Sequence, residues 1–310
     1  MKVAVPFALL IVAVTVSSTL VPNFLDAAYL LDKSTIYMEI GLLALGLCFV
    51  IACGEIDLSV GSNVALTGCL TALVLKSGAS IPVAVAFACL CGTLLGTFNG
   101  LLVAYLRLPS FLVTLGTMAA FRGAAQAIVG ADSIALPDAF KGLDQSTVIG
   151  LPWPLVIFLV VALLMGAVFH RTVLGRQVVA VGTNESASRY SGIPVERTKV
   201  LAFALTGLLA GIAALLIDSR LAVARYDLAK GMELEAITVA VVGGAAIQGG
   251  VASIPGAVVS LFLIMVIKTA MGVANVKPEY QLTAIGTLLI LAVIANNVAE
   301  RRFRRATMTS

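Results

Sequence analysis

Residues 236–267 read AITVAVVGGAAIQGGVASIPGAVVSLFLIMVI, a continuous run without a charged side chain. A helix needs about 20 apolar residues to cross the roughly 30 Å hydrocarbon core of a bilayer. This run is therefore too long for one straight helix and too short for two. Gly249, Gly250, Pro255 and Gly256 interrupt it. We expect one half to be a short or re-entrant segment, which survives only where neighbouring helices, not lipid, satisfy its backbone polar groups.

The composition of the whole chain also indicates a membrane environment. Of the 310 residues, 60% are hydrophobic and 12% are charged, whereas a soluble domain carries about 25% charged residues. The mean hydropathy is +1.07. A soluble core of this size could not hide so much apolar surface, which excludes a cytosolic enzyme, a nucleic-acid-binding module and a disordered chain. We predict an all-α integral membrane protein in which one or more helices are broken or re-entrant.

Apolar runs separated by glycine and proline predict about ten transmembrane helices. The first run has no charge before Asp26 and no small-x-small cleavage pattern before Pro22, so we interpret it as a retained helix and not as a secretory signal. The eighth run is the weakest, because it lies within the interrupted stretch quoted above. The expected spans are 3–21, 36–53, 58–75, 81–106, 111–130, 153–170, 200–217, 234–249, 253–275 and 279–299.

The distribution of lysine and arginine predicts the orientation. The two densest basic clusters lie at 171–199 and 301–305, and an even number of passes places both on one side. Because cytoplasmic loops carry the excess of Lys and Arg, we expect the N- and C-termini to be cytoplasmic. The loop 131–152 would then be external, which suits its three aspartates and single lysine.

The sequence lacks the motifs of catalysis. It contains no G-x-x-x-x-G-K-[ST] phosphate loop, no H-E-x-x-H and no G-x-S-x-G. The five cysteines lie in or beside apolar runs and far from His170, the single histidine, so we interpret them as small apolar residues. We therefore expect no catalytic residue, no metal site and no cofactor. The net charge of +4 follows membrane topology and does not indicate a nucleic-acid partner.

The segment 54–62, which reads G-E-I-D-L-S-V-G-S, places charge and glycine between two apolar runs. Such a segment permits a broken helix whose polar groups face a transport pathway. Asp57 and Ser59 are the pathway candidates. The alternative is a plain tight loop in which Asp57 or Ser59 caps the next helix.

The segment 171–199 predicts a short cytoplasmic helix. Asn184 is a good N-cap, and Gly192 followed by Pro194 is a good stop. A helix over 185–191 is too short to be stable alone, so it must pack against something. Glu185, Arg189 and Tyr190 offer charge and an aromatic ring to a partner protein. The alternative is that this helix rests on the membrane ends of the protein itself.

The glycine pair Gly243 and Gly244 lies at the centre of the weakest span. Small residues let helices approach closely within a membrane. A short eighth segment needs such contacts, so we expect this pair near the centre of the protein and beside the transport pathway.

Three blocks of sequence resemble the permease subunits of bacterial ATP-binding-cassette importers for ribose, xylose, arabinose and related sugars. The segment 54–62 resembles the family pattern G-G-I-D-L-S-V-G-S, with Glu55 in place of the second glycine. The segment 171–199 resembles the family pattern R-T-x-x-G-R…A-x-G-x-N-x-x-A-x-x-x-G-I. A third block begins at Ala236 and includes Gly243, Gly244, Gly249, Gly250 and Gly256. Permeases for rhamnose and autoinducer-2 share these blocks. The loop positions that match are Arg171, Thr172, Gly175, Arg176, Ala180, Gly182, Asn184, Ala187, Gly192 and Ile193.

The resemblance implies a single permease domain over 1–310 in the bacterial cytoplasmic (inner) membrane, with a cytoplasmic coupling loop at 171–199. It implies import of a monosaccharide or a related polyol or sugar-like molecule. The implied partners are a second permease subunit (identical or a sister chain), two cytoplasmic ATP-binding subunits that hydrolyse ATP, and a periplasmic sugar-binding protein. The short helix would couple to the ATPase through Asn184, Glu185, Ala187, Arg189, Tyr190 and Gly192.

Three alternatives remain at the level of sequence. A secondary transporter driven by an ion gradient would keep ionisable residues deep within spans, and Glu39, Arg122 and Lys268 are the candidates. An ATP-driven permease of the same type could carry branched-chain amino acids instead. A membrane scaffold without transport activity is the third.

Overall fold

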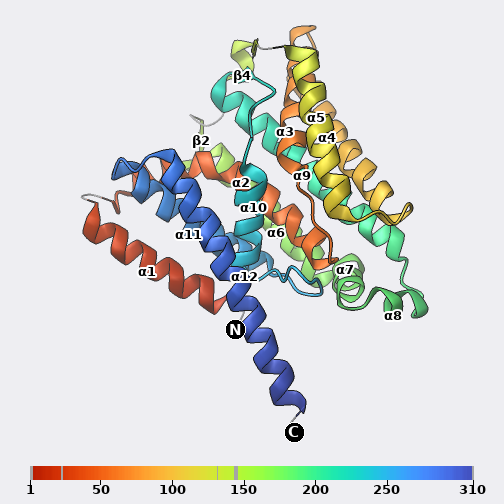
Figure 1. Ribbon diagram of the computed structural model, residues 1–310. Helices are drawn as coiled ribbons and strands as arrows, with labels where there is room; N and C mark the ends of the chain where they lie inside the picture. The colour runs from red at the N-terminus through yellow and green to blue at the C-terminus, as the bar shows by residue number, and fades with distance from the viewer. Residues whose placement is uncertain (1–2, 22–23, 131, 143–145, 309–310) are drawn as a thin grey trace.

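The structure is a computed structural model that describes residues 3–21, 24–130, 132–142 and 146–308, with side chains described up to residue 294 (Figure 1). Within these residues the chain is mostly helical. The helices are α1 (Ala4–Leu20), α2 (Ala27–Ala52), α3 (Val60–Lys76), α4 (Ile81–Ala104), α5 (Ser110–Val129), α6 (Trp153–Arg171), α7 (Val173–Thr183), α8 (Glu185–Tyr190), α9 (Val195–Leu221), α10 (Met232–Val242), α11 (Ile254–Val273) and α12 (Pro278–Met308).

The remaining elements are short and lie in two connections. A 3-10 helix, η1 (Asp138–Phe140), follows the strand β1 (Ile134–Ala135). β1 pairs antiparallel with β4 (Val223–Ala224), and β2 (Thr147–Val148) pairs antiparallel with β3 (Leu151–Pro152). These strands of two residues do not alter the all-α class.

The predicted membrane class is confirmed, whereas ten spans are not. Each expected span falls on a helix, but among the described residues six helices have the length and hydropathy to cross a membrane: α2, α4, α5, α6, α9 and α11. The apolar helices α1 and α3 and the segment Pro278–Ile294 of α12 are shorter. α10 has 11 residues, about 16 Å at 1.5 Å per residue. This is roughly half the hydrocarbon core, so the expectation of a short eighth segment is correct.

Three helices are several residues longer than the sequence indicated: α2, α9 and α12. α2 begins at Ala27 and not at residue 36, because an Asp26 carboxylate oxygen accepts the N–H groups of Ala28 and Tyr29 at 2.8 and 3.2 Å. This N-cap satisfies two of the free donors of the first turn. α12 continues to Met308, past the expected end at 299.

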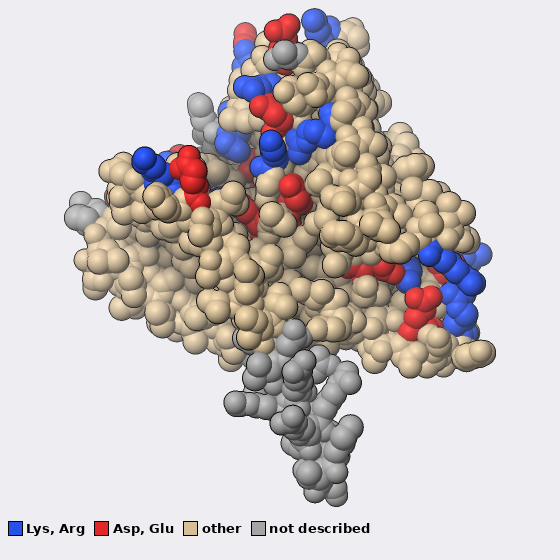
Figure 2. Space-filling model, viewed as in Figure 1, with Lys and Arg blue, Asp and Glu red and all other residues tan. Residues whose placement is uncertain are grey.

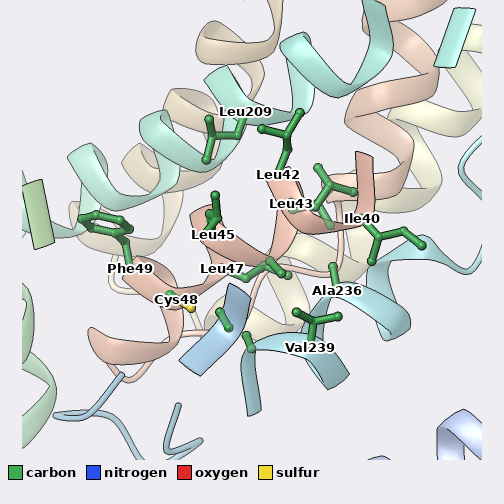
Figure 3. Close-up of a cluster of buried hydrophobic side chains, with 14 of the residues drawn as sticks. Ile40, Leu42, Leu43, Leu45, Leu47, Cys48, Phe49, Leu209, Ala236 and Val239 are labelled. Atoms are coloured by element: carbon green, nitrogen blue, oxygen red, sulfur yellow. The ribbon is translucent and has the colours of Figure 1, made fainter. Parts of the chain in front are cut away.

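The core forms around α2, which is buried almost continuously from Ser34 to Ala52. Figure 3 shows Leu42, Leu45 and Phe49 of α2 with Leu209 of α9 in one hydrophobic cluster. α9 also packs on α4 at very short range. A Cβ on Gly96 of α4 would lie 2.9 Å from the Cα of Gly207, so only glycine allows this approach of two helices.

The two ends of the molecule differ in what they carry. α8, the start of α1 and the far end of α12 lie toward the lower side of Figure 1, while β4 lies at the upper side. Figure 2 shows charged side chains in the upper part of this face and over α8 at the lower right, with a broad uncharged belt across the rest. Such a belt fits a protein whose middle faces lipid.

Candidate functional site

The connection between α2 and α3 is an irregular segment, 53–59, that is partly buried. Asp57 is 2% exposed and Ser59 is 1% exposed. Its backbone is satisfied from α5: the N–H of Ile56 donates to Ser110 Oγ at 3.1 Å, and Thr114 Oγ1 donates to the Ile56 carbonyl at 3.2 Å. Non-helical backbone at membrane depth is tolerated only with such protein partners. We call residues 53–59 the break.

Asp57 and Ser59, both sequence-predicted, form one hydrogen-bonded unit. Ser59 donates to the same carboxylate oxygen of Asp57 twice, from its N–H at 2.9 Å and from its hydroxyl at 2.6 Å. Asn99 of α4 donates to Ser59 Oγ at 2.7 Å. Ser59 is the N-cap residue of α3, yet its side chain accepts no bond from the first turn. Asp57 therefore accepts hydrogen bonds from the N-cap residue Ser59. The alternative interpretation instead expected Asp57 or Ser59 to cap the first turn of the helix.

The predicted short helix is present as α8, and both of its ends are as expected. Asn184 Oδ1 accepts the N–H of Ala187 at 2.9 Å. At the other end the N–H of Gly192 donates to the Arg189 carbonyl at 3.1 Å, and the N–H of Ile193 donates to the Ser188 carbonyl at 3.0 Å. This pair of bonds, with φ +80° at Gly192, is a Schellman motif.

The exposed face of α8 suits contact with another protein. Tyr190 is 92% exposed, and Ala187 and Arg189 are also exposed. Of the residues in α8, Ser188 is the buried one. Sequence reasoning missed the helix α7, which precedes α8 and buries Val178 and Val181. The available signal was Thr172, whose hydroxyl accepts the N–H of Gly175 at 3.5 Å.

The three blocks of the sequence resemblance meet at one point, where glycines from distant segments touch. We call Gly54, Gly182, Gly249 and Gly250 the glycine junction. A Cβ on Gly249 would lie 2.7 Å from the Gly182 carbonyl oxygen and 2.8 Å from the Cα of Gly54. The N–H of Gly250 donates to the carbonyl of Ala52, at the end of α2, at 2.9 Å. The break, α7 and the α10–α11 connection are thereby packed backbone to backbone.

A charged contact joins the break to α8 beside this junction. The Lys199 ammonium of α9 lies 2.6 Å from Glu55 and 2.8 Å from Glu185. The Lys199 side chain is 10% exposed and that of Glu55 is 14% exposed. Arg189 also pairs with Glu185, at 3.2 Å, and with Glu196. The hydrogen bond from Lys199, with a smaller contribution from Arg189, lowers the pKa of Glu185 below its usual range. We call the Glu55–Lys199–Glu185 contact the Lys199 bridge.

The predicted glycine pair, Gly243 and Gly244, lies at the end of α10 and in the turn that follows it. Gly243 ends α10 and packs on α11, where a Cβ would lie 2.6 Å from the Cα of Ala257. Gly244 has φ +99°, a conformation that glycine adopts without strain. Gly243 thus permits a close helix approach, and Gly244 allows the chain to turn.

The ionisable residues expected within spans have partners. Arg220 Nε donates to Glu39 at 3.0 Å, and Lys268 pairs with Glu235 at 2.7 Å. Arg122 donates to the carbonyls of two residues in the β4–α10 connection, Tyr226 and Leu228, each at 2.6 Å. Sequence reasoning missed one further buried carboxyl, Asp218 of α9, which packs against Gly68 of α3. Its position at the end of an expected span was the available signal.

Comparison with known proteins shows one family. The family model described as "Branched-chain amino acid transport system / permease component" matches residues 29–293. The chain is 35% identical over 287 residues to the autoinducer 2 import system permease protein LsrD of Yersinia enterocolitica, covering 90% of this chain and 87% of that protein. It is 34% identical over 302 residues to LsrD of Escherichia coli strain K12, covering 95% and 92%. No solved structure gives a significant match.

These matches cover the break, the α7–α8 loop, the glycine junction and the buried helices that hold them together. They agree with the apolar belt and with the sequence blocks that meet in the structure. The chain belongs to the family of branched-chain amino acid transport system permease components, and it is a multi-pass permease subunit of an ATP-binding-cassette importer in the inner membrane.

Proposed function

We propose that this permease imports a monosaccharide or a related small polyol or sugar-like molecule. The names of its relatives refer to autoinducer 2 import, and the segment 54–62 resembles the sugar-type pattern. The family description names branched-chain amino acids, which makes these the competing substrate class. In this proposal the substrate is delivered by a periplasmic binding protein and crosses between this chain and a second permease subunit, either identical or a sister chain.

The observation that carries the mechanism is the Lys199 bridge. Two cytoplasmic ATP-binding subunits would hydrolyse ATP, and their movement must reach the membrane part through a physical contact that differs between states. α8, with exposed Tyr190, offers the contact surface. Lys199 then joins α8 to the break through Glu185 and Glu55, at 2.8 and 2.6 Å. Displacement of α8 would therefore pull directly on the segment that holds Asp57 and Ser59.

We place ten segments in the membrane, with α10 reaching only part of the way across. Both termini would be cytoplasmic, together with 171–199, because Figure 1 shows the start of α1, α8 and the end of α12 toward the same side. Reporter fusions after residue 190 and at residue 310 should both read cytoplasmic, and a fusion at residue 140 should read periplasmic. A periplasmic C-terminus would overturn this topology.

The function is tested by reconstitution with the ATP-binding subunit and the periplasmic binding protein that this proposal requires. Proteoliposomes should hydrolyse ATP faster and accumulate label when given a pentose or autoinducer 2, and should not respond to leucine. Stimulation by leucine alone would favour the amino-acid alternative. Uptake by this chain alone, driven by a proton gradient, would favour the secondary transporter, although Glu39 and Lys268 are both held in ion pairs here.

A further inference from the structure

An apolar groove runs between α6 and α11 and opens on the outside of the helix bundle. Its volume is about 800 Å³. Leu159, Leu163 and Ala167 line it from α6, and Val258 and Val259 line it from α11. Leu163 is 75% exposed, so the groove faces the surroundings of the bundle and not its core.

The groove ends at basic side chains. His170 and Arg171, at the C-terminal end of α6, line its last part. From Leu159 to His170 the helix rises about 16 Å, at 1.5 Å per residue. This is close to half of the roughly 30 Å hydrocarbon core, the depth of one leaflet. The groove therefore has the length of a lipid acyl chain and a basic end at the depth of a headgroup.

A second cavity continues from this basic end. It has a volume of about 450 Å³, shares His170 with the groove, and is lined by Arg176 of α7 and by Gly250 and Ser253 of the α10–α11 connection. Among the residues that the structure describes, no aspartate or glutamate lines either cavity. Arg171 and Arg176 are exposed, and neither forms an ion pair with the side chains that the structure describes.

These two arginines belong to the R-T-x-x-G-R run. Neither takes part in the Lys199 bridge or in the exposed face of α8. The alternative is that both are simply solvated. Solvation alone does not account for their placement on either side of His170, with Arg171 of α6 at the end of the groove and Arg176 of α7 in the second cavity. Basic pockets between transmembrane helices are sites for anionic lipid headgroups.

We propose that the groove binds one anionic phospholipid. An acyl chain lies between α6 and α11, and the phosphate lies where the two cavities meet at His170, with Arg171 on the groove side and Arg176 on the side of the second cavity. A lipid in this position would join α7 to α11 next to Gly250 of the glycine junction. The inference requires only that the chain lies in a membrane, and it does not depend on the substrate or on α8 contacting an ATPase.

The test counts lipids that stay bound to the full-length permease. The protein would be reconstituted in vesicles of phosphatidylcholine with 20% phosphatidylglycerol, extracted gently and examined by native mass spectrometry. We expect retained phosphatidylglycerol on the parent and at least a fivefold loss in the double variant Arg171→Gln/Arg176→Gln. Arg197→Gln, which removes an exposed arginine of α9 outside both cavities, is the matched control and should retain it.

A second variant leaves the charges in place. Ala167→Phe fills the groove from α6 and should also reduce retained phosphatidylglycerol, even if the double arginine variant were poorly folded. Equal retention by the parent and Ala167→Phe would overturn the groove as the acyl site. Retention of phosphatidylcholine in preference would overturn the anionic headgroup. A double arginine variant that keeps its lipid but loses the ATPase on purification would assign these arginines to the ATPase and refute the proposal.

Discussion

The ammonium group of Lys199 lies 2.6 Å from a carboxylate oxygen of Glu55, although one belongs to a long helix and the other to the break. Residue 55 is where the chain departs from the pattern that it resembles, since a glycine stands there in that pattern. The Glu55 carboxylate pairs with Lys199 of α9, which also pairs with Glu185 of α8. The side chains of Glu55 and Lys199 are both largely buried. The departure therefore adds a link to the coupling region.

Glu55→Gln should weaken coupling more than folding. The variant leaves Lys199 with Glu185 as its remaining carboxylate partner, and a hydrogen bond to a charged group contributes about 1.5–3 kcal/mol. We expect substrate-stimulated ATP hydrolysis in proteoliposomes to fall several-fold while ATPase binding is kept. Glu196→Gln is the matched control, because it removes a partner of Arg189 and leaves the Lys199 bridge intact. Equal stimulation in Glu55→Gln and the parent would mean that the bridge transmits nothing.

Asp57→Ala should abolish transport, and Asp57→Asn should retain part of it. The alanine removes the acceptor of both hydrogen bonds from Ser59 in a buried site, at a cost of about 1–3 kcal/mol for the groups left without partners. Asparagine keeps one oxygen acceptor. Uptake assays and thermal denaturation of the purified protein would separate transport from stability. Normal uptake by Asp57→Ala would exclude a role for the break in the pathway.

Gly249→Ala and Gly231→Ala form a matched pair. Both glycines have nearly the same φ, +88° and +89°, but Gly249 lies within the junction whereas a Cβ on Gly231 would meet nothing within 4 Å. In each variant the alanine must adopt a left-handed backbone conformation, which destabilises the folded protein by roughly 1–2 kcal/mol. Gly249→Ala adds overpacking of about 1–3 kcal/mol, so its melting temperature should fall further and its transport should be lost. Similar losses in both variants would show that the junction tolerates a methyl group.

Gly192→Val should detach the ATPase. The residue ends α8 at φ +80° with open space around it, so the effect is backbone strain, which is severe for a β-branched side chain. The matched control is Gly116→Ala on α5, where a Cβ also meets nothing within 4 Å but no positive φ is required. Co-purification of the ATPase would be measured for both. If Gly192→Val retained the ATPase and its stimulation, α8 would not be the coupling helix.

Acid should loosen α8. The pKa of Glu185 is lowered in the folded protein, chiefly by Lys199, so its ion pairs stabilise α8 fully above the unfolded pKa of about 4.3. That contribution is lost as the pH falls below this value and through the lowered folded pKa. Hydrogen exchange of the α8 amides should therefore rise, relative to α7, on lowering the pH from 6 to 3.5. In Glu185→Gln the exchange should already be raised at pH 6 and should change less with pH.

The sequence by itself determined the features that depend on neighbours along the chain. Long apolar runs placed the helices, since burial in lipid depends on local hydropathy. Asn184 and Gly192 located α8, because an N-cap and a left-handed stop act within one helical turn. The glycines and proline after residue 243 predicted that α10 would be short, for the same local reason.

Only the tertiary structure decided which of these segments meet. Lys199 was one basic residue among several in its loop, and nothing local indicated that its ammonium would reach Glu55. Gly54, Gly182 and Gly249 were separate turn signals until the packing of three segments brought them together. Such contacts depend on how α2, α7 and the α10–α11 connection cross in space. Their partners are far apart in the chain, so no periodicity or capping pattern encodes which atoms touch.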